Sequence, residues 1–154
     1  MLNELSERIL DIARSHPKAI AVSTESRDIT YAQLAKDTMF PIKSRTLAVI
    51  EPTDPISYVS EFMSLLASEC QILPLPPNLH SVTRNDIRDR IEQAEGRNRR
   101  FEPGTVLHFT SGSSGSQKLV VRPSGNLIDE AKSVSTTLNL SLGSKVLVTT
   151  PLAH

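Results

Sequence analysis

The sequence predicts an α/β fold in which a parallel-rich sheet is flanked by helices. Continuous apolar, β-prone runs occur at residues 46–50, 72–75 and 105–109, and such runs are typical of strands covered on both faces. Between the first two runs, residues 56–70 carry apolar side chains at helical spacing. A strand, a helix and a second strand in this order form a βαβ unit, so we expect the first two strands to be parallel.

Further elements are predicted from local patterns along the rest of the chain. Residues 3–15 place apolar side chains at helical spacing between charged ones, and Pro17 ends this amphipathic helix. A short strand is expected over residues 19–23 and a second helix beginning at Tyr31. Residues 145–150 form one more apolar, β-prone run, which predicts another buried strand.

Polar side chains that can cap a helix mark the starts of three helices. Thr53 or Asp54 precedes the first, Ser81 or Thr83 the second and Ser124 the third. The second of these helices carries arginines that alternate with acids. We expect them to pair with one another on a solvated face: Arg84, Asp86, Arg88, Asp89, Arg90 and Glu92.

The composition indicates a single domain, residues 1–154, that is soluble and cytoplasmic. The net charge is zero, so no strong field attracts nucleic acid or an anionic membrane. The N-terminus lacks the pattern of a signal peptide, and no apolar run is long enough to span a bilayer. The single cysteine, Cys70, excludes a disulfide framework and is expected to be a small buried hydrophobe.

The stretch that points most directly to chemistry joins the apolar run at residues 105–109 to β-prone residues 119–121. It is rich in hydroxyls and glycines and ends in a lysine. Glycines let backbone N–H groups approach an anion closely, hydroxyls donate hydrogen bonds, and lysine supplies a point charge. An exposed Gly/Ser turn is the alternative interpretation. As a phosphate site, the loop would use Thr110, Ser111, Gly112, Ser113, Ser114, Gly115 and Lys118.

This loop lacks the Gly-Lys-(Ser/Thr) of a Walker loop and the three glycines of a dinucleotide fingerprint. It resembles the signature loop of the adenylate-forming (AMP-binding) enzymes, which include acyl- and aryl-CoA synthetases and the adenylation domains of nonribosomal peptide synthetases. Their loop reads Thr-Ser-Gly-(Ser/Thr)-(Ser/Thr)-Gly-x-Pro-Lys, usually followed by Gly. Residues 110–115 and Lys118 match, whereas Gln117 replaces the proline and Leu119 the glycine. The family also usually has Ala-Gly where this chain has residues 68–70.

The resemblance covers essentially the whole chain and implies the N-terminal subdomain of an AMP-forming ligase. In such enzymes a carboxylate attacks the α-phosphate of ATP, and the thiol of coenzyme A or of a carrier-protein phosphopantetheine then displaces AMP. The loop would hold the β- and γ-phosphates, and His154 would lie beside the substrate pocket, unless it is a frayed end. The family's magnesium-binding and lid motifs follow the matched part. We therefore expect an N-terminal fragment that is inactive alone, with no catalytic residue of its own.

Two other classes of function remain open at this stage. The chain could be a non-catalytic module that keeps a nucleotide or phosphate loop. It could also be an interaction protein whose exposed sheet edge pairs with another chain, which would make it a homo-oligomer. As a ligase, its partners would be a carboxylic acid and, in some members of the family, an acyl carrier protein.

Overall fold

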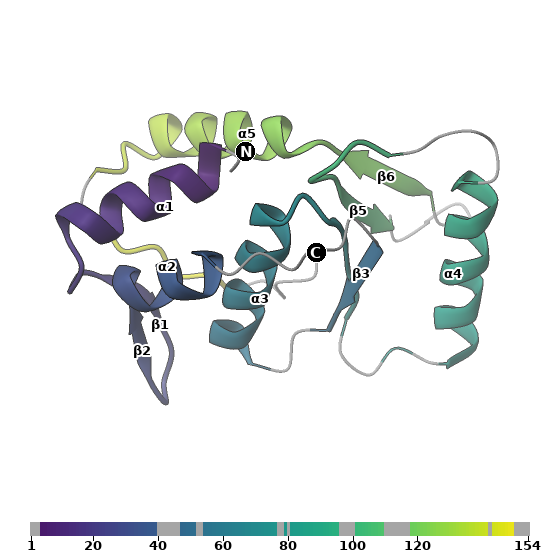
Figure 1. Cartoon of the computed structure of the whole chain (residues 1–154), viewed down its shortest axis with the longest axis horizontal. Helices are drawn as coiled ribbons and strands as arrows, with labels where there is room; N and C mark the ends of the chain where they lie inside the picture. Colours follow the sequence, from purple (N-terminus) through teal and green to yellow (C-terminus); the bar gives the residue numbers. More distant parts are fainter. Residues whose placement is uncertain are drawn as a thin grey trace.

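The computed structural model describes residues 4–39, 47–51, 54–76, 79, 81–95, 101–109, 118–141 and 143–149. Its helices are α1 (Glu4–Ser15), α2 (Tyr31–Met39), α3 (Pro55–Ala67), α4 (Ser81–Glu95) and α5 (Ser124–Thr137). Its strands are β1 (Ile20–Ser23), β2 (Asp28–Thr30), β3 (Leu47–Ile50), β4 (Gln71–Pro74), β5 (Val106–Phe109) and β6 (Leu119–Arg122) (Figure 1).

The central sheet contains β3, β4, β5 and β6, in that order. The first three strands are parallel, and β6 runs antiparallel to β5. Because α3 connects β3 to β4, the predicted βαβ unit and the parallel-rich α/β fold are both confirmed. The strands β1 and β2 form a separate antiparallel hairpin that precedes α2.

The middle of the sheet is covered on both faces, as its continuous apolar strands predict. The run that forms β3 is instead an edge strand, in which Val49 is 50% exposed. Successive side chains of β4 enter different clusters: Ile72 packs with apolar side chains of α1, α2 and α3, and Leu73 packs with Ile87 and Ile91 of α4. Figure 1 shows the same arrangement, with the sheet between α3 on one side and α4 on the other. Cys70 is buried in the first cluster, as expected.

Both ends of α3 are held by hydrogen-bonded caps. At its start Asp54 is the N-cap, and its carboxylate accepts from the Ser57 backbone N–H at 2.8 Å. At its end the Cys70 N–H donates to the Leu65 carbonyl at 3.0 Å, which closes a Schellman turn. That turn places Glu69 at φ 57°, in the left-handed region that favours glycine. Glu69 therefore occupies the position of this turn at which glycine is usually found.

Two sequence predictions about the last third of the chain are wrong. Residues 145–149 form no strand and are exposed, because no strand among the described residues pairs with them; residue 150 lies outside the description. Ser124 is not the N-cap of α5 but its first residue. The cap position is Pro123, which has no side chain able to accept a hydrogen bond.

The expected pairing of charges along α4 is correct for one arginine and wrong for another. Arg90 pairs with Asp86 of the same helix, with 2.9 Å between Nε and Oδ2. Arg84 instead pairs with Glu51, which follows β3: Nη1 lies 2.5 Å from Oε1, and Nη2 lies 2.6 Å from Oε2. Its Nε also donates to the Leu79 carbonyl at 3.2 Å. Arg84 thus joins the start of α4 to the sheet.

Candidate functional site

The ends of the predicted phosphate loop are fixed by an antiparallel pair of strands. β5 leads into the loop and β6 leads out of it, with Phe109 paired to Leu119 across the ladder. Paired residues of antiparallel strands lie about 5 Å apart at Cα, so residues 110–118 span a short gap between two fixed ends. The two strands that the sequence predicted before and after this stretch are confirmed.

The first half of β5, the strand before the loop, is buried. Val106 and Leu107 are almost completely buried, one on each face of the sheet. Thr105, also buried, donates its hydroxyl to the Glu102 carbonyl at 2.6 Å. Phe109 and Leu119 both pack against the cluster beneath α4. The base of the loop is therefore set by close packing, which a phosphate site requires of its scaffold.

Lys118 is exposed and lies at the amino end of β6, directly before Leu119. Because β6 runs antiparallel to β5, this end of β6 adjoins the carboxyl end of β5. The other predicted site residues lie outside the described residues: Thr110, Ser111, Gly112, Ser113, Ser114, Gly115 and His154. Their roles, like that of Lys118, stay predictions.

The carboxyl ends of β3, β4 and β5 share one edge of the sheet, where open α/β folds bind their ligands. The start of α3 also faces this edge, but the carboxylate of Asp54, its N-cap, already occupies that end of the helix. The Ser57 backbone N–H, the Ser57 hydroxyl and the Arg27 guanidinium hold the pKa of Asp54 at about 2. A phosphate at α3 would have to displace this carboxylate, so the loop after β5 is the better anion site on this edge.

A second group of polar side chains lies along the β5–β6 hairpin, and no sequence pattern predicted it. Arg122 of β6 is hydrogen-bonded to Glu130 of α5, which ties the helix after the loop to the strand. His108 is half-buried on the same face of the β5–β6 pair, and its pKa is lowered by burial and then by the charge of Arg122. His108 is therefore held neutral beside the loop. The cross-strand register brings His108 and Arg122 onto one face, whereas Glu130 reaches Arg122 from α5.

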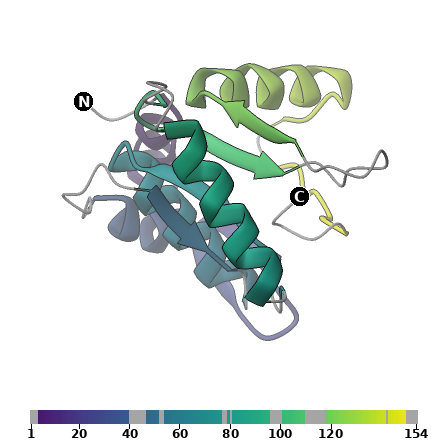
Figure 2. The same cartoon turned by 90° about the vertical axis from the view of Figure 1, so that its right-hand side faces the viewer.

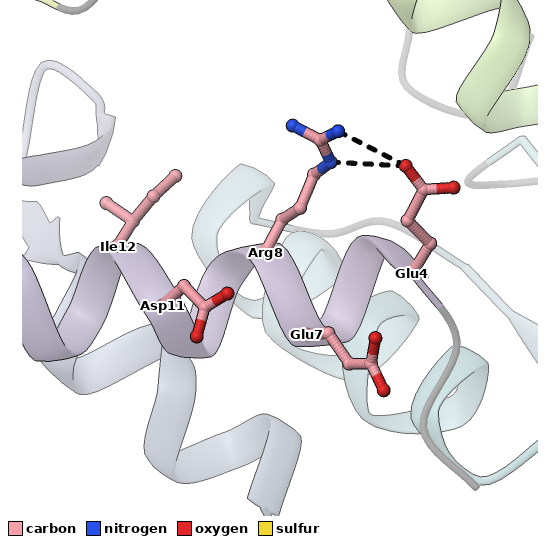
Figure 3. Close-up of a pocket in the computed structure, with 5 residues that line it drawn as sticks. All are labelled: Glu4, Glu7, Arg8, Asp11 and Ile12. Atoms are coloured by element: carbon pink, nitrogen blue, oxygen red, sulfur yellow. Dashed lines mark hydrogen bonds and ion pairs between the residues drawn. The ribbon is translucent and has the colours of Figure 1, made fainter.

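An open depression of about 370 Å³ lies along α1, away from this edge. Figure 3 shows that its charged side chains come from successive turns of one helix, with Arg8 hydrogen-bonded to Glu4. Glu4 also pairs with Lys132 of α5 at 3.0 Å, and this contact lowers the pKa of Glu4. The hollow is thus an open, exposed surface on which charged side chains form ion pairs. The described residues contain no group of three or more side chains that could hold a metal ion.

The fold matches solved structures over most or all of its length. O-succinylbenzoate coenzyme A synthetase (MenE) from Bacillus subtilis, in complex with AMP, superposes with a TM-score of 0.73 at 18% identity. The match covers 100% of this chain and 50% of that one. This is the fold of the adenylate-forming enzymes. No family model matches the sequence, and no curated protein matches it.

Two further structures show the same adenylate-forming fold. VinN matches with a TM-score of 0.60 at 14% identity, over 90% of this chain and 48% of that one. The N-terminal subdomain of NpsA from Klebsiella oxytoca, in complex with anthranilyl-AMSN, matches with a TM-score of 0.57 at 16% identity, over 79% of this chain and 41% of that one. The chain spans about half the length of the structures it matches. Among the described helices, none is both long and apolar enough to cross a membrane.

Proposed function

We propose that the chain is the N-terminal, phosphate-binding part of an ATP-dependent, AMP-forming ligase that joins a carboxylic acid to a thiol. The observation that carries this proposal is the position of residues 110–118. The sequence there has the hydroxyls, glycines and lysine of a phosphate loop. Its two ends are fixed at the ligand-binding edge of a sheet whose fold matches MenE, which has been solved with AMP and with ATP and magnesium.

In this proposal the loop acts by binding and by neutralising charge, not by covalent chemistry. Thr110, Ser111, Ser113 and Ser114 would donate hydrogen bonds to the β- and γ-phosphates, while Gly112 and Gly115 would let the backbone approach them. An oxygen of the acid attacks the α-phosphorus, and the bond to the bridging oxygen of pyrophosphate breaks. Lys118 would stabilise the charge that develops on the leaving pyrophosphate.

In the second step the thiol sulfur attacks the acyl carbon and AMP leaves. The acceptor would be coenzyme A or the phosphopantetheine of an acyl carrier protein, and His154 would contact the acid. Magnesium would neutralise the phosphates of ATP, with ligands beyond those described here. Use of ATP and the absence of a disulfide framework fit a cytoplasmic location.

Calorimetric titration of ATP and of pyrophosphate into the 154-residue chain tests the loop. We expect weak binding that Lys118→Ala reduces at least tenfold, because a charged phosphate contact contributes about 1.5–3 kcal/mol. Lys18→Ala is the matched control, since Lys18 is an exposed lysine in the turn after α1. It removes the same charge and should leave the affinity unchanged.

The outcomes separate the classes of function. Binding that depends on Lys118 but without acyl-adenylate formation supports a phosphate loop in a chain that is inactive alone. Equal loss of binding in both variants indicates attraction by overall charge and contradicts a site at the loop. Formation of acyl-adenylate by these 154 residues would show that the expected inactivity of the isolated chain is wrong.

A further inference from the structure

The hairpin of β5 and β6 places a histidine at the base of the proposed phosphate loop. His108 pairs with Val120 across the ladder, and the next pair is the last one before the loop. One ladder position is about 3.3 Å of strand, so His108 lies close to the point where the loop begins. Lys118, the predicted phosphate-binding lysine, stands two residues before Val120.

The face of the hairpin that carries His108 opens toward the loop. Val106 lies on the same face at the other end of β5 and is 1% exposed, whereas His108 is half-buried and its partner Val120 is 38% exposed. Figure 2 shows α5 running alongside β6. Its Glu130 reaches Arg122, the partner of Val106, at the end of the hairpin that lies away from the loop. A molecule held at the loop can therefore approach the imidazole.

The charged groups beside His108 belong to β6 and α5. Arg122 lies diagonally across the ladder from His108 and is ion-paired with Glu130 of α5. Lys118 stands at the loop end of β6. Burial first, and then the charge of Arg122, lower the pKa of His108. In the free protein these surroundings hold the imidazole in its neutral form.

The titratable groups that other elements add on this side of the sheet keep one charge state near neutral pH. The cluster between the sheet and α3 contains Tyr58 and Cys70; burial raises the pKa of Tyr58 to about 12 and also raises the pKa of Cys70. Asp54, at the start of α3, pairs with Arg27 beside β3, two strands away from β5. Of these titratable groups and His108, only His108 changes charge between pH ~6 and ~8.

We propose that His108 is a second anion-binding residue of the phosphate site and takes up a proton from water when a polyphosphate binds at the loop. A nearby anion favours the charged form of an ionisable group. The imidazolium donates an N–H hydrogen bond to a phosphate oxygen and offsets part of its charge, which the neutral ring does less strongly. Binding through His108 is then tighter at low pH. This inference rests on the proposed function, because the anion is the one that the loop holds.

Calorimetric titration of pyrophosphate into the wild-type chain and into His108→Gln tests the proposal. Pyrophosphate itself gains protons as the pH falls, but the ratio of the two affinities at one pH cancels that effect. At pH ~8 the two proteins should bind equally. At pH ~6 the wild type should bind at least ~3-fold more tightly, because only the wild type can add a charge to the site there. His16→Gln, at an exposed histidine that follows α1, is the control and should match the wild type at both pH values.

Nuclear magnetic resonance of the histidine rings reads the proton directly and does not depend on a variant that folds. The chain has four histidines. At pH ~6.5, added pyrophosphate should move the ring signals of His108 from the neutral toward the protonated position. The ring signals of His16 should stay where they are.

The outcomes separate this inference from the proposed function. Equal affinities of wild type and His108→Gln at pH ~6, or a His108 ring that stays neutral at saturating pyrophosphate, would overturn the inference. An equal loss of affinity in His16→Gln would also overturn it, because the effect would then come from overall charge. If binding still depends on Lys118 in these cases, the phosphate loop stands. Binding that depends on His108 but not on Lys118 would retain this residue and reject the loop, and no binding at either pH would reject both.

Discussion

Replacing Glu69 by glycine should make the chain more stable than replacing it by alanine. Glu69 is the pivot of the turn after α3, with φ 57°, and its N–H donates to the Leu66 carbonyl at 3.1 Å. A Cβ atom in this left-handed conformation costs about 1–2 kcal/mol, and glycine avoids that cost. Glycine in turn loses more backbone entropy on folding, by about 0.5–1 kcal/mol. The net difference should be about 0.5–1 kcal/mol in favour of Glu69→Gly.

The comparison with alanine is needed because both substitutions remove the same contacts of the glutamate side chain. The assay is equilibrium denaturation by urea, read by circular dichroism, or a thermal melt in which 1 kcal/mol shifts Tm by about 2–4 °C for a domain of this size. The turn also matters for the sheet, because the Glu69 carbonyl accepts from the Gly104 N–H at 3.0 Å, just before β5.

Glu61 provides a matched control in the same helix. It is exposed in the interior of α3, where glycine is less stable than alanine by about 0.8–1 kcal/mol. The order of the two variants should therefore reverse between positions 61 and 69. If Glu69→Gly proves less stable than Glu69→Ala, the left-handed backbone at this turn is not what limits stability, and the reasoning fails.

Three further predictions concern the sheet and its edge. Leu107→Ala should destabilise the chain by about 2–5 kcal/mol, measured by urea denaturation, because the side chain is 0% exposed; a loss under 1 kcal/mol would contradict the packing described for β5. The pKa of His108 is lowered in the folded state, so the unfolded chain binds more protons and stability should fall as the pH drops below about 6.5. His108→Gln should flatten this part of the pH profile, and an unchanged slope would argue against a neutral imidazole. The pKa of Asp54 is lowered to about 2, so its contribution should be present above pH ~4 and lost as the pH falls toward 2. Asp54→Asn, which keeps a capping oxygen, should lose this acid dependence, whereas Asp54→Ala should also be less stable at neutral pH; equal stability of the two variants there would refute the cap.

The local elements could be predicted from the sequence because their causes are local. The apolar run of β3, the apolar helix after it and Pro55 at its first turn act within a few residues of one another. Parallel pairing of β3 and β4 also follows, since a single connecting helix allows little else. The hydroxyls, glycines and lysine of residues 110–118 similarly predict a phosphate loop before any contact is known.

What the tertiary structure alone decided were the partners that lie far apart in the sequence. The nearest acids to Arg84 are on its own helix, yet it pairs with Glu51 because α4 packs beside the carboxyl end of β3. His108 and Arg122 meet only through the register of β5 and β6. Residues 145–149 have strand propensity, but a strand also needs a neighbour to satisfy its backbone, and the described part of the chain provides none. Sequence determines what each segment is suited to form, and only the assembled surfaces determine which segments find a partner.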